Sequence, residues 1–475
     1  MEAINFYMPI TSQPRELDAK LLLALFARER GMNPVIGYKS TFQARLASLP
    51  PGFFLVHNAR QKSEKIDRLR RFGHKVLVLD EEALVRQSDE IFMKKHPRDA
   101  FEHVNWVFAW GDDDFKLWPD IGMKPDENLF VTGNPRVDTM RPETRPFHAA
   151  DVAGLRARFG RYVLFNTNFP TVNNLTTRGG GVRLAEWALD ERGRQVEQDF
   201  LANKRRMYEA MLELVPRLAR AIAPTMLLIR PHPNEDHEPW HRAARDIANA
   251  QVVFEGGVVP WIIGARALVH NNCTTAVEAA VLGTPILNFR PWRSEFDNGL
   301  AHAFGTDCTD FKSLAARLEH ILGGGEGGLS KVQASLLRHH ISHLDGPFAC
   351  ERIVDLVQAD GAHMSDASGR TVEERSRISR ELKMLWWRRY LRLFTTTRGL
   401  RKFAYLRRNF PRLKVHRLDY EMLDYNEEQI ELLMRQFPPP DKHDIDDRIR
   451  RFSLALGRFA NMEAKLLGDM LFTIA

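Results

Sequence analysis

Short apolar runs alternate with amphipathic helical stretches through the first two-thirds of this 475-residue chain. This alternation is typical of α/β layers on largely parallel sheets, because a helix crosses back over the sheet after each strand. A first strand is expected over Ile4–Ile10, followed by a helix that Pro14 opens and Gly31 ends. The further apolar runs lie in Asn33–Tyr38, Gly52–His57, His74–Asp80, Asn105–Gly111, Asn128–Pro135, Arg161–Phe169, Thr225–Asp236, Gln251–Gly256, Ala265–Asn272 and Thr284–Arg290.

The series divides into two expected Rossmann-like, doubly wound domains, residues 1–141 and 151–360. Residues 142–150 are polar, contain two prolines and are predicted to be the linker. Long helices are expected from about Gln195 to Ala221 and from Leu329 to about Val357, and residues 361–475 are expected to form a basic helical tail. Two such layers would enclose a cleft, with ligands at the carboxyl ends of the strands.

The composition excludes several classes of protein. Hydrophobic residues make up 44% and charged residues 27%, as in ordinary globular domains. No run of 18 uncharged apolar residues occurs, and the N-terminus lacks the features of a secretory signal. The three cysteines are far apart, which favours a reducing compartment, and the lack of CxxC and HExxH gives no support for zinc.

The positive charge is concentrated near the C-terminus. Residues Arg375–Arg417 contain 15 Lys/Arg and one acid, Glu381, so this window carries +14 and the rest of the chain 7 − 14 = −7. Tryptophan, phenylalanine and leucine at helical spacing accompany the arginines, which predicts a helix on an anionic membrane surface. The alternatives are a helix packed on the body of the protein and, with no supporting motif, a nucleic-acid contact.

The stretch Val269–Leu287 contains a strand end, a polar loop and the start of a helix. The N–H groups of such a helix start would stabilise a phosphate, and a carboxylate one turn in could accept hydrogen bonds from sugar hydroxyls. The expected ligand-binding residues here are His270, Asn271, Thr274, Thr275 and Glu278. A structural alternative is a capping box formed by Thr275 and Glu278.

A second motif, Ile229–Asp236, directly follows an apolar strand and holds two prolines. Arg230 and His232 suit a phosphate or a sugar carboxylate. Glu235 and Asp236 are candidates for a general base or nucleophile. Alternatively, Asp236 caps a helix beginning near Pro239, and His232 is structural.

A third motif, Val131–Asp138, forms a turn after a strand. Asn134 and Arg136 are expected to contribute to binding, whereas the alternative is a structural hinge turn in which Asp138 caps a helix. Other candidates are Asn166 and Asn168, as sugar-hydroxyl binders at a strand end, and Asp18, as a base whose alternative role is helix N-terminal charge. The basic helix Arg60–Arg71 suggests a solvated face or a contact with acidic lipid or acceptor.

These motifs carry a resemblance to known families. The E-A-x-x-x-G-x-P pattern at Glu278–Pro285 resembles the nucleotide-sugar domain of GT-B glycosyltransferases and UDP-GlcNAc 2-epimerase-like proteins, in which the Glu holds the ribose. The R-x-H-P loop at Arg230 resembles sialyltransferase-like and Kdo-transferase-like enzymes, and T-G-N-x-x-x-D at Thr132 resembles epimerase-like and polymer glycerophosphotransferase-like proteins. With further motifs in the same order, residues 1–360 resemble the bacterial surface carbohydrate biosynthesis protein family.

The resemblance implies a GT-B-like, metal-independent glycosyltransferase without a cofactor, with a nucleotide sugar as co-substrate. The acceptor would be a lipid-linked glycan of lipopolysaccharide or capsule, at the inner face of the cytoplasmic membrane, with no nucleic-acid partner. The first domain would hold the acceptor. A CDP-polyol phosphotransferase, a nucleotide-sugar epimerase and a non-catalytic membrane scaffold remain alternatives.

Overall fold

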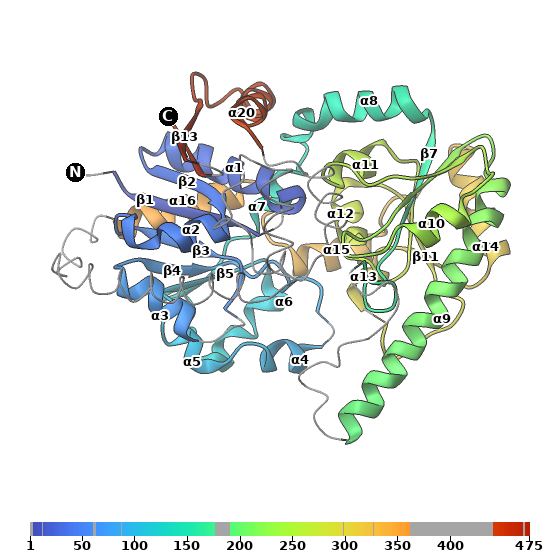
Figure 1. The fold of residues 1–475 in the computed structure, drawn as a ribbon, viewed down its shortest axis with the longest axis horizontal. Helices are drawn as coiled ribbons and strands as arrows, with labels where there is room; N and C mark the ends of the chain where they lie inside the picture. The colour runs from blue at the N-terminus through green and yellow to red at the C-terminus, as the bar shows by residue number, and fades with distance from the viewer. Residues whose placement is uncertain are drawn as a thin grey trace, which may run out of the picture. The chain divides into compact units, whose positions relative to one another are not determined.

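The computed structural model describes residues 3–11, 13–59, 63–86, 88–175, 191–297, 299–325, 327–361, 440–468 and 471–475. Contacts divide the chain into two units (Figure 1). Unit 1 takes in Met1–Leu84, Ser88–Phe147 and Arg338–Ala475, and unit 2 takes in Val85–Gln87 and His148–Leu337. The chain thus leaves unit 1 within the segment 142–150 that was expected as a linker, and returns to unit 1 at Arg338.

Unit 1 is built on an eight-stranded sheet in the order β13-β14-β2-β1-β3-β4-β5-β6. Its strands are β1 (Asn5–Ile10), β2 (Asn33–Tyr38), β3 (Phe53–Val56), β4 (Lys75–Val78), β5 (Trp106–Ala109), β6 (Leu129–Val131), β13 (Ala464–Gly468) and β14 (Leu471–Ile474). The strands β1 to β6 are parallel. The chain passes from β1 to β2 on one side and then to β3 on the other, so the order reverses between β1 and β3.

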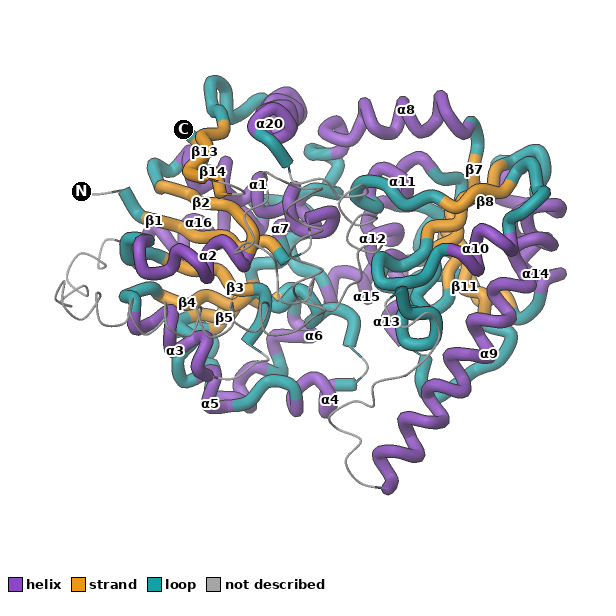
Figure 2. Tube along the Cα trace, in the orientation of Figure 1, coloured by secondary structure: helices purple, strands orange, loops and turns teal. Residues whose placement is uncertain are grey.

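Helices cover this sheet (Figure 2). The described helices of unit 1 include α1 (Gln13–Glu29), α2 (Lys39–Arg45), α3 (Ser63–Arg71), α4 (Asp89–Lys94), α5 (Arg98–Phe101), α6 (Asp112–Phe115), α7 (Pro135–Asp138), α16 (Ala349–Gly361) and α20 (Lys442–Leu456). In α1 the apolar run from Leu21 to Ala27 is buried all round, at 0–1% exposed. A helix that is apolar on all sides needs partners on all sides. Here α1 contacts β2, α7, α16 and α20.

The C-terminal residues return to unit 1. Phe452 of α20 stacks on Phe147 at 4.0 Å between ring centroids, and β14 pairs antiparallel with β2. A helical tail was expected to the end of the chain, and this was wrong for Ala464–Gly468 and Leu471–Ile474, which are strands. The basic window Arg375–Arg417 lies outside the described residues.

Unit 2 is built on a six-stranded parallel sheet in the order β12-β11-β10-β7-β8-β9. This is the strand order of dinucleotide-binding folds, and its reversal falls between β7 and β10. The strands are β7 (Tyr162–Asn166), β8 (Met226–Arg230), β9 (Ala250–Val252), β10 (Leu268–His270), β11 (Ile286–Phe289) and β12 (Thr306–Cys308). The described helices include α8 (Ala149–Phe159), α9 (Glu191–Ala221), α10 (Glu238–Ala243), α11 (Val259–Gly264), α12 (Thr275–Leu282), α13 (Gly299–Ala303) and α14 (Phe311–Leu322).

The two parallel, doubly wound sheets confirm the expected α/β fold class. One expected helix, Leu329 to about Val357, was wrong as a single element. The structure has α15 (Lys331–His340) and α16, with an irregular connection between them. Gly346 in this connection has a φ of +74°, a left-handed conformation that a helix cannot hold, and Pro347 follows it.

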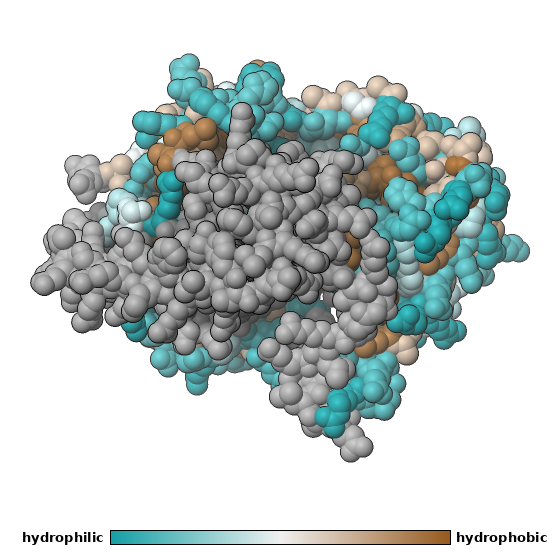
Figure 3. Space-filling view, viewed as in Figure 1, coloured by the Kyte–Doolittle hydropathy of each residue, from teal (hydrophilic) through white to brown (hydrophobic). Residues whose placement is uncertain are grey.

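The described surface shows only scattered apolar side chains. Figure 3 shows hydrophobic colour in small groups among hydrophilic residues on the part of the visible face that is coloured. The large hydrophobic residues that are exposed in the described chain are Val196, Val332, Leu454, Leu466 and Leu467. None of the described helices combines the length and apolarity needed to pass through a bilayer.

Candidate functional site

Four polar side chains occupy the last rung of adjacent parallel strands in unit 2. The strand register aligns Arg230 of β8 with Asn166 of β7, Asn166 with His270 of β10, and His270 with Asn288 of β11. This rung lies at the carboxyl edge of the sheet and includes the reversal between β7 and β10, where ligands bind doubly wound sheets. Asn288 was not among the residues expected from the sequence.

Arg230 is a buried cation whose side chain donates hydrogen bonds to neutral backbone carbonyls. Its guanidinium donates to the backbone carbonyls of Glu255 at 3.0 Å and Gly256 at 2.6 Å, and its side chain lies over the Trp261 ring. The residue is 8% exposed, and burial lowers the pKa of its guanidinium to about 10, opposed by Glu255 and Glu278. A desolvated guanidinium with carbonyl partners is well suited to receive an anion.

The start of α12 lies beside this cation. Thr275 is its first residue, and the Thr275 hydroxyl accepts from Asn166 Nδ2 at 2.9 Å and donates to Cys273 Sγ. Thr274 precedes it as the N-cap residue and makes no side-chain cap hydrogen bond. The buried Oδ1 of Asn166 has no hydrogen-bond partner within the described chain. A helix N-terminus with an unsatisfied polar side chain next to it points to a ligand.

Lys204 of α9 is a site residue that the sequence analysis missed. It is 7% exposed, and burial lowers the pKa of its ammonium group, opposed by the nearby Cys273, Glu235 and Asp297. Its Nζ lies 5.7 Å from the Phe169 ring centroid. A second desolvated cation therefore lies beside the loop that leads into α12.

The loop after β8 is fixed in place by Glu235, which is 0% exposed. Its carboxylate accepts hydrogen bonds from Thr167 Oγ1 (2.6 Å), Phe169 N (3.0 Å), His232 N (3.1 Å), Trp240 Nε1 (3.0 Å) and Asn173 Nδ2 (3.3 Å). Burial raises the pKa of the carboxyl, and these hydrogen bonds oppose it. The expectation of a general base at Glu235 is corrected: the group is enclosed by its own donors and holds the loops after β7 and β8 together.

His232 and Asp236 lie in the same loop with different roles. His232 is half-buried, and its Nδ1 accepts from Asn234 N at 3.2 Å. The neutral ring then carries its proton on Nε2, which makes that nitrogen a hydrogen-bond donor. Asp236 Oδ1 accepts from Glu238 N at 3.0 Å at the start of α10, whose N-cap position is His237.

Two buried histidines, His270 of this rung and His302, pack against each other. His270 Nδ1 accepts from Cys273 N at 3.3 Å, and its ring stacks on His302 with centroids 6.0 Å apart. Burial, with a contribution from His302, lowers the pKa of His270 to about 3. Both rings are therefore neutral at ordinary pH, so His270 orients the loop after β10 and carries no charge for an anion.

The remaining expected residues of unit 2 lie along the same edge. Asn168 Nδ2 donates to Asn272 O at 2.9 Å, and Asn271 Nδ2 donates to Phe289 O at 2.9 Å. Glu278 is half-buried in the first turn of α12 and interacts electrostatically with Arg230. The loops after β7, β8 and β10 therefore converge on one edge, although the ligand contacts of these residues stay a prediction.

The three expected residues of unit 1 have structural partners. Asn134 Oδ1 accepts from Arg136 N at 2.8 Å and caps α7. Arg136 forms an ion pair with the buried Glu81 at 3.4 Å. Asp18 forms an ion pair with Arg448 of α20, and its expected role as a base stays a prediction.

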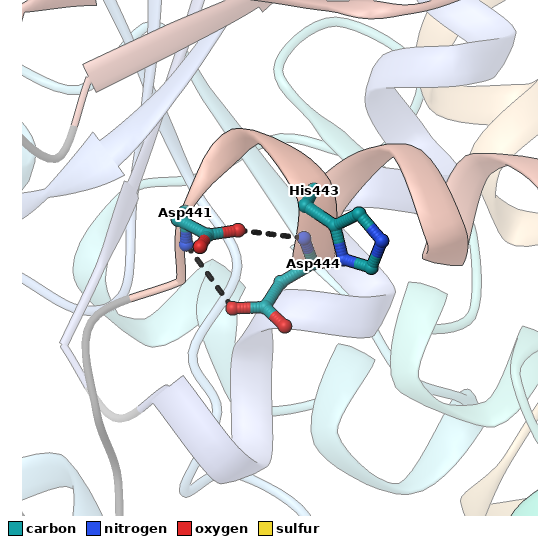
Figure 4. A group of neighbouring side chains, drawn as sticks. All are labelled: Asp441, His443 and Asp444. Atoms are coloured by element: carbon teal, nitrogen blue, oxygen red, sulfur yellow. Dashed lines mark hydrogen bonds between the residues drawn. The ribbon is translucent and has the colours of Figure 1, made fainter.

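A metal site was not expected, and the described residues offer one geometric candidate, formed by Asp441, His443 and Asp444 (Figure 4). All three are exposed. Asp441 accepts from Asp444 N at 2.9 Å, and Asp444 accepts from Asp441 N at 3.2 Å. These bonds form the capping box of α20, which accounts for the arrangement without an ion.

The sheets and the site together define a class: two doubly wound α/β units, of which unit 2 has two buried cations and a helix N-terminus near its strand reversal. No protein-family model matches the chain, and no curated protein matches its sequence.

Solved structures with a similar fold include a teichoic acid polymerase and UDP-GlcNAc 2-epimerases. The Wall Teichoic Acid Polymerase TagF with CDPG is 9% identical, with 76% of this chain and 89% of that chain covered and a TM-score of 0.47. A putative UDP-N-acetylglucosamine 2-epimerase from Listeria monocytogenes is 13% identical (77% and 98% covered, TM-score 0.47). The UDP-GlcNAc 2-epimerase from Methanocaldococcus jannaschii is 11% identical (75% and 100% covered, TM-score 0.48). Likeness at this level concerns the fold and carries no conclusion about the reaction.

Proposed function

We propose that unit 2 binds the phosphates of a nucleotide-activated sugar and that the protein transfers this sugar to an acceptor. The observation that carries the proposal is the buried guanidinium of Arg230, which donates hydrogen bonds to two backbone carbonyl oxygens at the carboxyl ends of the strands, near the start of α12. Lys204 adds a second buried cation. Two desolvated cations and a helix N-terminus favour an anion with more than one charge, such as a diphosphate.

In this reaction the negative charge grows on the nucleotide as the bond to the sugar breaks. Arg230 and Lys204 would stabilise that charge, and the Nε2–H of His232 would donate a hydrogen bond to a phosphate oxygen. These groups supply electrostatic stabilisation from the chain itself, in keeping with the metal-independent mechanism that the resemblance implies. Glu278, near Arg230, would accept hydrogen bonds from the ribose.

The acceptor is proposed from the sequence resemblance and the charge distribution. The resemblance of residues 1–360 favours a lipid-linked surface glycan of lipopolysaccharide or capsule. The charge of Arg375–Arg417 supports binding to an anionic membrane on its cytoplasmic side. The test is co-sedimentation with anionic vesicles, which an internal deletion of residues 375–417 should abolish without lowering the melting temperature.

Thermal-shift measurements with UDP-, CDP-, CMP- and GDP-linked sugars test the donor site directly. A ligand at 100 times its dissociation constant stabilises the fold by about 2.7 kcal/mol. Arg230→Gln should lose this stabilisation. Arg266→Gln is the matched control. This exposed arginine precedes β10 and therefore lies at the amino ends of the strands of the same sheet. Equal ligand shifts in the two variants would contradict the site.

Product analysis then separates the reaction classes. Sugar transfer releases a nucleoside phosphate together with a new glycosidic bond. Polyol-phosphate transfer from a CDP-linked donor releases CMP, and an epimerase that leaves the donor intact releases no nucleotide.

A further inference from the structure

Unit 1 has a pocket at its own strand reversal. The pocket lies at the carboxyl ends of β1 and β3, where Pro9, Thr11, Val56 and His57 line it, and residues of α2 and α3 complete its walls. Its empty volume is about 850 Å³, which includes open solvent at its mouth. In doubly wound sheets this is the position at which ligands bind.

The floor of the pocket is formed by apolar side chains that are almost fully buried. Phe42 and Phe54 pack edge to face at 5.4 Å between ring centroids and are 1% and 5% exposed. Leu46, Ile66 and Leu69 continue this surface and are 4%, 3% and 9% exposed. Apolar walls so little wetted favour an uncharged, slender hydrocarbon group.

The same pocket carries polar groups and positive charge. Lys39 and Arg68 both line it. The buried atoms Thr11 Oγ1 and His57 Nδ1 have no hydrogen-bond partner within the described chain. Buried polar atoms are normally paired, so a ligand oxygen beside them would relieve a cost. These cations and donors favour an anionic group with several oxygens at one end of the ligand.

We propose that this pocket binds an amphipathic anion, namely a single hydrocarbon chain that ends in a phosphate monoester. The chain would lie on Phe42, Leu46 and Phe54, and the phosphate would contact Lys39, Arg68 and Thr11. The basic helix that the sequence indicated at Arg60–Arg71 thereby acquires a role at its described residues Ile66, Arg68 and Leu69. The proposal concerns unit 1 alone and does not depend on nucleotide-sugar binding by unit 2.

Decyl phosphate, used below its micelle concentration, is the probe for calorimetric titration of the full-length protein. Decanol carries the hydrocarbon alone, and inorganic phosphate carries the anion alone. We expect each of these to bind about tenfold or more weakly than decyl phosphate, because each keeps half of the interactions. Equal affinity for decanol would overturn the anionic half of the proposal, and equal affinity for phosphate would overturn the apolar half.

Variants locate the binding. Leu46→Trp fills the floor, and Gln43→Trp obstructs the pocket from an exposed position on α2, which guards against a folding defect of the first variant. Each should weaken decyl phosphate binding about tenfold or more. Lys39→Gln should weaken decyl phosphate but not decanol, whereas Lys94→Gln, an exposed lysine on α4, should change neither. Undiminished binding of decyl phosphate to both tryptophan variants would refute the site.

Two further measurements identify the source of the ligand and test whether the pocket is independent of the nucleotide site in unit 2. Binding to vesicles that contain lysophosphatidic acid, a single-chain phosphate monoester, and its loss in Gln43→Trp would identify a bilayer lipid, whereas binding of decyl phosphate alone identifies a soluble phosphorylated chain. Either result supports the pocket. Arg230→Gln should retain decyl phosphate binding, so a failure of the nucleotide site and a failure of this pocket are distinguishable. Loss of decyl phosphate binding in Arg230→Gln would contradict the placement in unit 1.

Discussion

Asn166 donates a hydrogen bond from its side-chain amide to the hydroxyl of Thr275 at 2.9 Å and thereby joins the end of β7 to the first residue of α12. The bond crosses the strand reversal of unit 2. Because Asn166 is also in register with Arg230, it lies between the helix N-terminus and the buried cation. One amide thus connects the start of α12 to the strand rung of Arg230, two features that are far apart in the sequence.

Replacing Thr275 by Val should therefore affect binding more than folding. Loss of a neutral hydrogen bond costs about 1 kcal/mol of unfolding free energy. The nucleotide should lose affinity by about tenfold, because the Asn166 side chain is no longer held against the start of α12. Urea denaturation and calorimetric titration measure the two effects. An unchanged affinity would show that the ligand does not reach the start of α12.

Lys204→Met should have opposite effects on stability and on binding. An unpaired buried ammonium opposes folding, so the variant should keep or raise the free energy of unfolding by up to about 1 kcal/mol. Loss of a charge-assisted contact worth about 1.5–3 kcal/mol should lower nucleotide affinity at least tenfold. Arg205→Met, at an exposed neighbouring position, is the control. A stabilised variant that binds normally would remove Lys204 from the site.

Glu235→Ala should destabilise unit 2 by about 3 kcal/mol or more, because five donors lose their common acceptor in the interior. The exposed Glu238→Ala should cost under about 0.5 kcal/mol. Urea unfolding compares them. If Glu235→Ala is as stable as the wild type yet inactive, the carboxylate acts in catalysis and the structural role assigned here is wrong.

Asp138 should make stability fall as the pH rises towards neutrality. Its carboxylate accepts from Ala349 N at 3.1 Å and Cys350 N at 2.8 Å at the start of α16, and burial raises its pKa to about 7, opposed by these bonds. The unfolded carboxyl ionises near pH 3.9, so the native state holds the extra proton between about pH 4 and 7. The stability advantage of the wild type over Asp138→Asn should shrink across this window and stay level above it. A constant difference in urea midpoints from pH 5 to 8 would disprove the titration.

His270 should contribute to acid lability with the opposite slope. Its folded pKa is about 3 because of burial, while an unfolded histidine titrates near 6.5. The unfolded state therefore binds the additional proton between these values, and stability is lost as the pH falls from about 6.5. His270→Gln should reduce this loss by up to about 1.4 kcal/mol per pH unit. Calorimetric melting from pH 4.5 to 7.5 measures the slope, and identical slopes would place the effect elsewhere.

The sequence predicted the parallel strands well. The expected strand Asn33–Tyr38 coincides with β2, and the run at Ile4–Ile10 differs from β1 by one residue. Strands that are buried on both faces appear in the sequence as continuous apolar runs bounded by turns. Their positions can therefore be predicted from neighbouring residues alone. The hairpin β13–β14 was missed because its pairing with β2 depends on contacts across more than 400 residues.

The site was only partly predictable, because some of its residues are positioned by long-range contacts and not by local sequence. Arg230 and Thr275 follow strand ends, which places them at the carboxyl edge whatever the details of packing. The burial of Glu235 depends on Trp240 and Asn173, which local sequence does not bring together. Lys204 did leave a signal: it lies four residues after Phe200 and three before Met207, on the apolar stripe of α9.

The pairing of β14 with β2 shows that the chain beyond the basic residues Arg375–Arg417 returns to the sheet of unit 1. Residues 362–439 begin after α16 and end before α20, and both helices contribute to the core of unit 1. The described residues on both sides of this segment are therefore packed in the core of unit 1. Truncating the chain at residue 361 would remove core side chains such as Phe452 and Ile474 together with the arginines, so loss of function in such a protein would report misfolding as readily as loss of lipid contact.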